Sequence, residues 1–415
     1  MSVKFDIVVF GATSFVGEIV CRYMRDTYPN GEVNWAMAAR SETKLNKLQS
    51  ELGLEQIPHL LADADDQASI DTLATRAAVI ISTVGPYALY GEPMIKACAE
   101  SGTDYVDLTG EPHWIHAMLE KYETIAQDSG ARIVHCCGFD SIPSDLGVHF
   151  LQQNAKQSLG SVCTQVRTRV KSMKGGASGG TVASILNVVK EATKNAKLRK
   201  LLANPYAICP QEHGFKAYQE NLSYAKYEPE TDSWIAPFIM ASINTRVVHR
   251  SNALLNNEYG DRFLYDEAMM TGKSVKGSFM GWTVTAMLSG LMVGAAIPPT
   301  RWLLENTILP KPGEGPSKEE QLNGFWDYRL FGTTPDNQKI TVKVTGDRDP
   351  GYGSTAKMLS EAAISLAEDE AVQAKSGGFW TPATAFGDVL IERLQRNAGL
   401  TFEVLEQYPG NETKG

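Results

Sequence analysis

The chain has 415 residues, of which 43% are hydrophobic and 21% charged, a composition typical of a globular protein with two or three structural units. Its formal net charge is −9 and it contains no basic stripe or run, which argues against nucleic acid as a partner. The six cysteines show no CxxC pair and no disulfide-type spacing, and the N-terminus shows no signal peptide. We therefore expect a reduced, cytoplasmic setting.

The stretch 4–20, KFDIVVFGATSFVGEIV, predicts a strand, a tight glycine turn and the start of a helix. The apolar run 7–10 is typical of a strand that is buried on both faces. Gly11 removes the Cβ that would block the turn, and Gly17 lets the helix lie close to the strand. The unpaired N–H groups and the dipole of the helix N-terminus favour a phosphate there. A dinucleotide is therefore expected to contact Gly11, Thr13, Ser14, Phe15, Val16 and Gly17.

This glycine loop departs from the GxGxxG fingerprint. Its second position is Ala12, and Ser14 stands at the middle glycine position. A plain structural turn is the alternative interpretation. The place of the loop, after a strand and before a helix at the start of the chain, favours the dinucleotide.

The end of the second strand, 33–39, bears on the choice of cofactor. An enzyme selective for NAD usually carries Asp or Glu there, which bonds the ribose hydroxyls. This chain has Arg40 and Ser41 instead, with Lys44 one turn further on, and the two cations suit the 2′-phosphate of NADP. We expect NADP, with NAD as the second choice. A solvated arginine at a helix start is the alternative interpretation of Arg40.

Two further strand ends extend the predicted cofactor site. Asp63 follows the third strand, 59–62, and is either a cap on the adenine end or a turn residue. The fourth strand, 78–84, runs into a loop that should contact the pyrophosphate or the nicotinamide ribose. The residues expected to make these contacts are Thr83, Val84, Gly85 and Pro86. Tyr87 and Tyr90 either pack within this loop or cover the nicotinamide.

Strands at 104–108 and 132–136, alternating with helices, predict a doubly wound parallel sheet with right-handed crossovers. Open α/β sheets bind ligands at the carboxyl ends of their strands, and Asp140 lies at such an end. Candidate proton donors for hydride transfer are Tyr87, Asp140 and Ser141. Cys136 and Cys137 lie at the same edge and are either buried, inert cysteines or a source of a catalytic thiolate. No metal is expected, because no His, Cys and Asp cluster has ligand spacing.

A set of ordered motifs spans almost the whole chain. The set comprises GATSFVG, AAR, STVGPYALYGEP, DYVDLTGEPHW and CCGFDSIPSDLG, continued near the C-terminus by GYGSTAKMLSEAA and SGGFWTPATAFG. With these motifs the chain resembles the saccharopine-dehydrogenase-like oxidoreductases, a family that includes trans-acting enoyl reductases. Some members of that family are tied to glycolipid or polyketide-lipid biosynthesis and some to lipid droplets.

The resemblance implies an α/β fold with three parts. These are an NAD(P)-binding Rossmann domain with a doubly wound parallel sheet, a second α+β domain, and a C-terminal segment that returns to the first domain. We expect their boundaries at 1–145, 146–345 and 346–415.

The pattern changes beyond Ser144. Alternation over 162–171 predicts a strand with one wet face. The glycine-rich run 174–180 precedes a helix and is either a second anion site or a flexible linker. His249 is either a substrate-facing acid or a structural histidine. The remaining expected elements are helices at 181–192, 353–367 and 388–396, strands at 324–333, 339–345 and 401–405, and a loop at 377–387.

Residues 277–300, GSFMGWTVTAMLSGLMVGAAIPPT, carry no charge and are long enough to cross hydrocarbon. Three interpretations compete: a buried or dimer-forming helix, a helix on a membrane surface, and a full span. A full span is the least favoured, because it would place the C-terminal part of the fold across the bilayer from the cofactor domain. Gly290 and Gly294 have the spacing of close helix packing. We expect a homodimer, with peripheral membrane contact through 277–300 as a further partner interaction.

The first functional hypothesis is an NADP-dependent reductase that transfers hydride to an enoyl or acyl, lipid-like substrate. Arg40 and the long apolar segment motivate it. A saccharopine-type reduction of an amino-acid imine is the second hypothesis, and it needs two or three cations to hold the substrate carboxylates. No such set can be assigned. The third hypothesis is a non-catalytic, membrane-associated protein that binds NADP.

Overall fold

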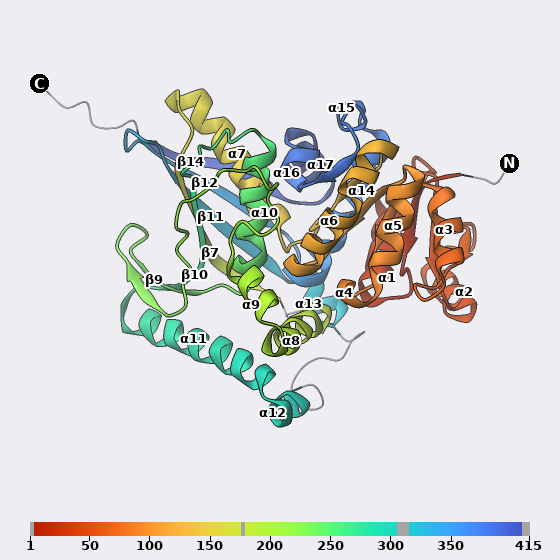
Figure 1. Ribbon diagram of the computed structural model, residues 1–415, viewed down its shortest axis with the longest axis horizontal. Coiled ribbons are helices and arrows are strands. Elements are labelled where there is room, and N and C mark those ends of the chain that lie inside the picture. The colour runs from red at the N-terminus through yellow and green to blue at the C-terminus, as the bar shows by residue number, and fades with distance from the viewer. Residues whose placement is uncertain (1–3, 176–178, 305–314, 409–415) are drawn as a thin grey trace, which may run out of the picture.

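Two seven-stranded sheets organise the computed structural model, which describes residues 4–175, 179–304 and 315–408 (Figure 1). The first sheet has the order β13-β6-β5-β4-β1-β2-β3, and all its neighbouring strands are parallel. Its strands are β1 (Phe5–Phe10), β2 (Trp35–Ala39), β3 (His59–Leu61), β4 (Ala77–Ser82), β5 (Asp104–Asp107), β6 (Arg132–Val134) and β13 (Gly378–Trp380). The strand order reverses between β1 and β4, where doubly wound sheets bind dinucleotides. The predicted doubly wound parallel sheet is confirmed.

Helices cover both faces of the first sheet. One layer contains α3 (Gln67–Thr75), α5 (Glu92–Ser101) and α6 (Pro112–Ser129), and the other contains α1 (Phe15–Thr27) and α14 (Thr355–Glu368). Two further helices of this part are α2 (Glu42–Leu52), which packs beside β2, and the short α4 (Tyr87–Tyr90), which precedes α5. Although α14 comes from the C-terminal part of the chain, it packs on α1, β4 and β5. The C-terminal segment therefore returns to the first sheet.

The second sheet is mixed and has the order β14-β12-β11-β7-β10-β9-β8. Its strands are β7 (Gln165–Lys174), β8 (Lys226–Glu228), β9 (Ser233–Pro237), β10 (Leu264–Gly272), β11 (Phe325–Thr333), β12 (Lys339–Gly346) and β14 (Thr401–Tyr408). In β11 and β12 every second residue is buried, which is the pattern of a sheet with one covered face. The covering helices are α7 (Ile142–Leu159), which packs on β11 and β12, and α10 (Ala241–Leu254), which packs on β10.

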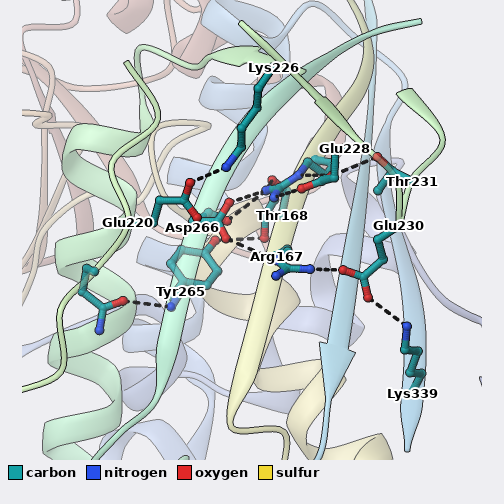
Figure 2. A network of polar contacts seen from close by, with 12 residues as sticks. Arg167, Thr168, Glu220, Lys226, Glu228, Glu230, Thr231, Tyr265, Asp266 and Lys339 are labelled. Atoms are coloured by element: carbon teal, nitrogen blue, oxygen red, sulfur yellow. Dashed lines mark hydrogen bonds and ion pairs between the residues drawn. The ribbon is translucent and has the colours of Figure 1, made fainter. Parts of the chain in front are cut away.

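Charged side chains of β7, β8 and β10 form a network of ion pairs (Figure 2). Arg169 is only 1% exposed, and it pairs with Glu228 (Nη2 to Oε1, 2.6 Å) and Asp266 (Nη1 to Oδ1, 2.6 Å). Burial alone would lower the pKa of Arg169, but the two carboxylates raise it overall. Arg167 pairs with Asp266 and with Glu230, which also binds Lys339. The sequence pattern predicts that one face of this strand is exposed to solvent. In the structure, Arg169 of β7 is buried together with its carboxylate partners, Glu228 and Asp266.

Several elements differ from the sequence prediction. An 18-residue helix, α7, was not predicted, because buried polar residues such as Ser144 and Asp145 interrupt its apolar pattern. The expected loop 377–387 contains β13 and α16 (Pro382–Ala385), and a three-residue strand is too short to leave an apolar run. β14 pairs with β12, so the C-terminal segment adds a strand to each sheet. The boundaries 1–145, 146–345 and 346–415 stay a prediction.

The remaining elements lie between the sheets and along one edge of the molecule. They are α8 (Gly179–Lys194), α9 (Ala196–Ala203), α11 (Ser274–Ala296), α12 (Pro298–Leu303), α13 (Lys318–Leu322), the π-helix η2 (Pro350–Ser354), α15 (Glu370–Gln373) and α17 (Asp388–Asn397). Figure 1 shows α11 along the lower edge, with α12 at its far end and α8 beside it.

The apolar segment 277–300 forms most of α11 and the start of α12. By length and composition α11 could cross a membrane. Its first half, however, packs on β9 and β10, where a Cβ at Gly277 would overlap the Gly272 carbonyl and one at Gly281 would lie 3.1 Å from Thr271 Oγ1. A full span would break this packing. Gly290 faces open space, so the Gly290–Gly294 spacing makes no helix pair within the described chain.

Candidate cofactor and substrate site

The glycine loop fits tightly between β1, β4 and α1. Gly11 has a φ of +85°, and a Cβ there would lie 2.6 Å from Thr83 Oγ1. A Cβ at Gly17 would overlap the Gly11 carbonyl oxygen and lie 2.9 Å from Ala12 Cα. Both positions therefore require glycine, one for its backbone conformation and the other for the close approach of helix and turn.

The first turn of α1 offers unpaired amides to an anion. Ser14 caps the helix: its Oγ accepts from the Gly17 N–H at 3.0 Å, and its own N–H donates to Gly11 O at 2.8 Å. Among the described residues, the N–H groups of Thr13, Phe15 and Val16 have no acceptor. These three amides, together with the helix dipole, suit the pyrophosphate of a dinucleotide. Ser14 replaces the usual glycine without closing the site, because its hydroxyl is used within the loop.

The loop after β4 locks the glycine loop in place. Thr83 Oγ1 donates to Gly11 O at 3.0 Å and lies 2.9 Å from Ser14 Oγ. Glu111 is fully buried, and its carboxylate accepts from the N–H groups of Tyr87 (2.9 Å) and Ala88 (3.0 Å). The predicted residues Thr83 and Gly85 line the cavity described below, whereas Val84 and Pro86 are not among its lining residues. Glu111 was not predicted, because its role depends on a contact across the fold.

The carboxyl ends of β2 and β3 lie outside the cavity wall. Arg40 directly follows β2 and is exposed, and Ser41 caps α2 by accepting from the Lys44 N–H at 3.4 Å. Within the described ranges neither Arg40 nor Lys44 forms an ion pair, so both cations are free for a 2′-phosphate. The Asp63 carboxylate accepts from the Asp65 N–H at 3.2 Å, which is the turn role that the sequence left open.

A cavity of about 1090 Å³ begins at the glycine loop and runs between the two sheets to α8 and α11. Its cofactor end is lined by Thr13, Ser14, Phe15, Val16, Glu18, Thr83, Gly85, Tyr87 and Asp140. Its far end is lined by Ile185, Val188 and Val189 of α8 and by Thr285, Leu288, Ser289, Met292 and Val293 of α11. The size is at the upper limit of ordinary small-molecule sites, which hold about 300–1,000 Å³.

Asp140 is the titratable group best placed for chemistry in this cavity. Burial, followed by the nearby Asp107 carboxylate, raises its pKa to about 7. No hydrogen-bond donor or cation among the described residues engages its carboxyl. The Asp107 carboxylate, in contrast, is hydrogen-bonded: one oxygen lies 2.7 Å from His135 Nδ1, and the other accepts from the Cys136 N–H at 3.1 Å. Asp140 therefore remains free to hold and release a proton at the cavity wall.

The other two predicted proton donors are committed elsewhere. Tyr87 lines the cavity, but its hydroxyl donates to Ser82 O at 2.9 Å, and burial, with Asp107 next, raises its pKa well above the usual value. Ser141 is fully buried and donates to Asn244 Oδ1 at 3.0 Å. Asn244 in turn donates to Glu267, within a polar network beneath the cavity. This geometry favours Asp140 over both.

The cysteine and histidine candidates are structural. Cys136 and Cys137 are buried, and desolvation raises the pKa of each thiol well above its usual value, as expected for inert cysteines. His249 is 1% exposed within an aromatic cluster, and burial lowers its pKa to about 3, so its ring is neutral. Residues 176–178, in the middle of the glycine-rich run 174–180, lie outside the described ranges, and so does the centre of the expected second anion site. The Gly179 N–H at the end of this run donates to Tyr352 Oη at 2.9 Å.

One cation on the cavity wall was missed by the sequence analysis. Arg246, on α10, is 7% exposed, and its guanidinium donates to the carbonyls of Ser242 and Leu202. Within the described chain it has no carboxylate partner, and burial lowers its pKa to about 10. No sequence signal marks this residue, because only the fold brings α10 to the cavity. It is the one Lys, Arg or His among the described cavity-lining residues.

The parallel sheet, the glycine loop and its free amides define a Rossmann-type dinucleotide-binding domain. A family model, the saccharopine dehydrogenase NADP binding domain, matches residues 7–134. A putative trans-acting enoyl reductase of Mycobacterium tuberculosis is 39% identical, over 94% of this chain and 95% of that protein. A trans-acting enoyl reductase of Mycobacterium bovis is 35% identical, over 94% and 96%. The chain belongs to the saccharopine dehydrogenase-like oxidoreductase family, and it is an NAD(P)-dependent oxidoreductase whose cofactor is NADP.

Solved structures share the fold at low sequence identity. A saccharopine dehydrogenase (L-Glu forming) of Saccharomyces cerevisiae matches with a TM-score of 0.55 and 10% identity, over 97% of this chain and 100% of that chain. A homospermidine synthase of Legionella pneumophila in complex with NAD matches with a TM-score of 0.52 and 10% identity, over 100% and 94%. At this identity the likeness shows the fold alone.

Proposed function

We propose that this protein reduces the carbon–carbon double bond of an enoyl group on an acyl, lipid-like substrate, with NADPH as reductant and Asp140 as proton donor. The observation that carries the proposal is an unpaired Asp140 carboxyl at the wall of a largely apolar cavity that begins at the glycine loop. The names of the relatives, trans-acting enoyl reductases, support the choice of reaction.

The chemistry needs few groups from the protein. Bound NADPH supplies a hydride to the β-carbon of the enoyl group. The protein holds the double bond against the cofactor and gives a proton to the α-carbon. Because the pKa of Asp140 is about 7, its acid form is populated near neutral pH and can provide that proton. One hydride and one proton add across the double bond, which yields the saturated acyl group and NADP⁺.

Arg246 favours a second candidate, reduction of an amino-acid imine. A buried guanidinium without a carboxylate partner could bind one carboxylate of such a substrate. An amino-acid imine built like saccharopine carries several carboxylates, however, and the described cavity wall offers this single cation. Among the described lining residues, α8 and α11 also contribute no cation that would bind a second carboxylate. The acyl substrate is therefore preferred.

Stopped-flow measurement of NADPH oxidation tests the proposal. Wild-type protein should oxidise NADPH with a 2-enoyl thioester and release the saturated thioester, identified by mass spectrometry. The imine formed from glutamate and an aldehyde should give no oxidation. NADPH binding without oxidation of any enoyl thioester would contradict the proposal and favour a non-catalytic, NADP-binding protein. Oxidation with the imine alone would favour the second candidate.

The outer face of α11 suggests a surface for lipid contact. We define this outer face as Val275, Phe279, Met280, Trp282 and Met287, all more than half exposed. This face is apolar, the other side of α11 is covered by the protein, and Lys273, Lys276 and Arg301 lie near the two helix ends, an arrangement that suits the interfacial region of a membrane. Exposed cations on α8 and α9, at 190–200, would add attraction to anionic lipid. We propose peripheral contact with an anionic bilayer through this face.

Sedimentation with lipid vesicles tests the membrane proposal. Wild-type protein should sediment with phosphatidylglycerol vesicles, and the double variant F279D/W282D should not. Tyr218→Asp is the matched control, because Tyr218 is 86% exposed and is not a residue of α11. If the wild type fails to bind vesicles and light scattering shows a dimer that F279D/W282D separates, the outer face is a homodimer interface instead.

A further inference from the structure

The far end of the cavity is built from two apolar helix faces that oppose each other. α8 contributes Ile185, Val188 and Val189, and α11 contributes a set that we call the inner stripe: Thr285, Leu288, Ser289, Met292 and Val293. The inner stripe follows positions i, i+3, i+4, i+7 and i+8, which is one face of a helix. A small apolar cluster of Leu186, Val189 and Ala295 joins the two helices next to the cavity, and it is separate from the main core.

The inner stripe continues a buried face of the same helix. Gly277, Gly281 and Thr285 are buried, and the two glycines pack on the second sheet. Towards the C-terminal half, where the sheet ends, this face borders the cavity instead. The opposite side of α11 is exposed: Met287, next to Leu288 in sequence, is 73% exposed and does not line the cavity. α11 therefore presents a wall to the cavity and a separate face to the surroundings.

The cavity changes character along its length. The cofactor end carries the loop amides, Thr83 and the two acids Glu18 and Asp140. α8 and α11 contribute no charged residue to the described lining, and the polar side-chain atoms that they contribute are the hydroxyls of Ser184, Thr285 and Ser289. Thr285 and Ser184 already donate, to Gly281 O (2.9 Å) and Glu111 Oε1 (2.8 Å). An occupant of the α8–α11 end would gain contact with apolar side chains and little else.

We infer that the space between α8 and α11 is the binding site for a hydrocarbon chain of the substrate, and that the chain runs past Leu288. This inference rests on the proposed function, in which the double bond lies beside Asp140. With the reacting end there, the rest of the acyl group has to follow the cavity, and α8 with the inner stripe forms a part of the described wall that carries no charged residue. Met292 and Val293 both line the cavity and are exposed, so a long chain leaves between them.

Chain-length selectivity tests this inference. In Leu288→Trp an indole would fill the channel, so the ratio of kcat/KM for a hexadecenoyl thioester to that for a crotonyl thioester should fall. Each excluded methylene should cost roughly fourfold. Met287→Trp is the matched control, because it adds the same side chain to the other side of the helix, and its ratio should equal that of the wild type. Val188→Trp, from the opposite wall, should repeat the effect if Leu288→Trp does not fold.

Binding of a pyrene-labelled fatty acid separates this inference from the proposed function. Wild type and Met287→Trp should bind the probe, and Leu288→Trp and Val188→Trp should bind it at least about tenfold more weakly. The wild type could reduce no enoyl thioester while Leu288→Trp and Val188→Trp still bind the probe more weakly than the wild type does. That result would contradict the proposed function and support the hydrocarbon-chain site. Equal probe affinity in all four proteins, or an equal loss of kcat/KM for short and long thioesters, would overturn the chain site.

Discussion

The two ends of the cavity are built in different ways. At the cofactor end, Gly11 and Gly17 remove clashes with backbone atoms, and Thr83 and Ser14 fix the loop by hydrogen bonds. At the α8–α11 end, the walls consist of side chains that need only be apolar and of suitable size, and one helix has its opposite face exposed. The comparison suggests that this protein fixes the position of the cofactor in detail and specifies the substrate chain only by shape and hydrophobicity.

The largest expected effect comes from removing the acid between the two ends. Asp140→Asn keeps the size of the side chain but removes its proton, so kcat for enoyl reduction should fall by about 10²–10⁴. The affinity for NADPH should not change, because the amides expected to bind the pyrophosphate belong to Thr13, Phe15 and Val16. Stopped-flow kinetics and NADPH titration measure the two quantities. Full turnover in Asp140→Asn would place the proton donor elsewhere.

A second variant tests how rigid the cofactor end is. Gly17→Ala puts a methyl group against the Gly11 carbonyl, and this overpacking should cost about 3 kcal/mol and abolish NADPH binding at micromolar protein. Gly290→Ala is the control in another helix, where a Cβ meets nothing within 4 Å. It should raise the free energy of unfolding by up to about 1 kcal/mol. Fluorescence titration and chemical denaturation report both. Unchanged NADPH affinity in Gly17→Ala would show that the loop can move.

The pH dependence of kcat follows from the raised pKa of Asp140. A carboxyl with a pKa of about 7 loses its proton as the pH rises through 7, so log kcat should fall with a slope of about one above that pH. In the folded state the group binds a proton up to a higher pH than in the unfolded chain, so wild-type stability should also fall between the usual carboxyl pKa and 7. Denaturation of Asp140→Asn should show a smaller fall, because Asp145, whose pKa burial also raises to about 7, still contributes. A flat kcat profile in the wild type would count against Asp140.

Cofactor choice should respond to the exposed cation after β2. Arg40→Ala should weaken NADPH binding about tenfold and leave NADH binding unchanged, because a charge-assisted hydrogen bond to the 2′-phosphate is lost. Lys121→Ala, an exposed cation that pairs with Glu92 on the other side of the domain, is the control. Parallel titrations with the two cofactors measure the ratio. An equal loss for NADPH and NADH would remove Arg40 from the phosphate site.

The smallest expected effect on stability concerns the outer face of α11. Phe279 is 74% exposed, so Phe279→Ser should change the free energy of unfolding by less than about 0.5 kcal/mol. The buried Tyr328, in the second sheet, is the contrast, since Tyr328→Ser should cost about 3–5 kcal/mol. Urea denaturation measures both. A large loss in Phe279→Ser would mean that the outer face is already covered in solution.

The sequence predicted best where local chemistry decides the structure. The glycine loop, the β1–β6 alternation and the cation after β2 are each marked by residues close together in the chain. Asp140 was proposed as a proton donor because a strand end precedes it, and its role stays a prediction. Arg246, Glu111 and the inner stripe could not be predicted in the same way. Arg246 reaches the cavity, and Glu111 binds the start of α4, only through contacts between elements far apart in the chain. For the inner stripe, the apolar spacing in α11 does not show which face of the helix will border a cavity.

Length also limited the prediction. β13 has three residues and β8 has three, so neither shows the alternation that identifies a strand. α7 carries buried Ser, Asp and His side chains that bind partners in other elements, which hides its apolar face from a periodicity argument. Arg169 was expected on a wet face because a charge in an alternating strand usually faces solvent, and only the pairing with Glu228 and Asp266 explains its burial.

The central claim is that the cavity holds NADPH at the glycine loop and that Asp140 gives the proton that completes reduction of an enoyl group. A single-turnover reaction in deuterated water tests it most directly, with a 2-enoyl thioester, unlabelled NADPH and mass analysis of the product. Our account predicts a saturated product with one deuterium at the α-carbon, formed by the wild type and slowed at least about a hundredfold in Asp140→Asn. Equal rates for the two proteins, or a product that retains its double bond, would contradict it.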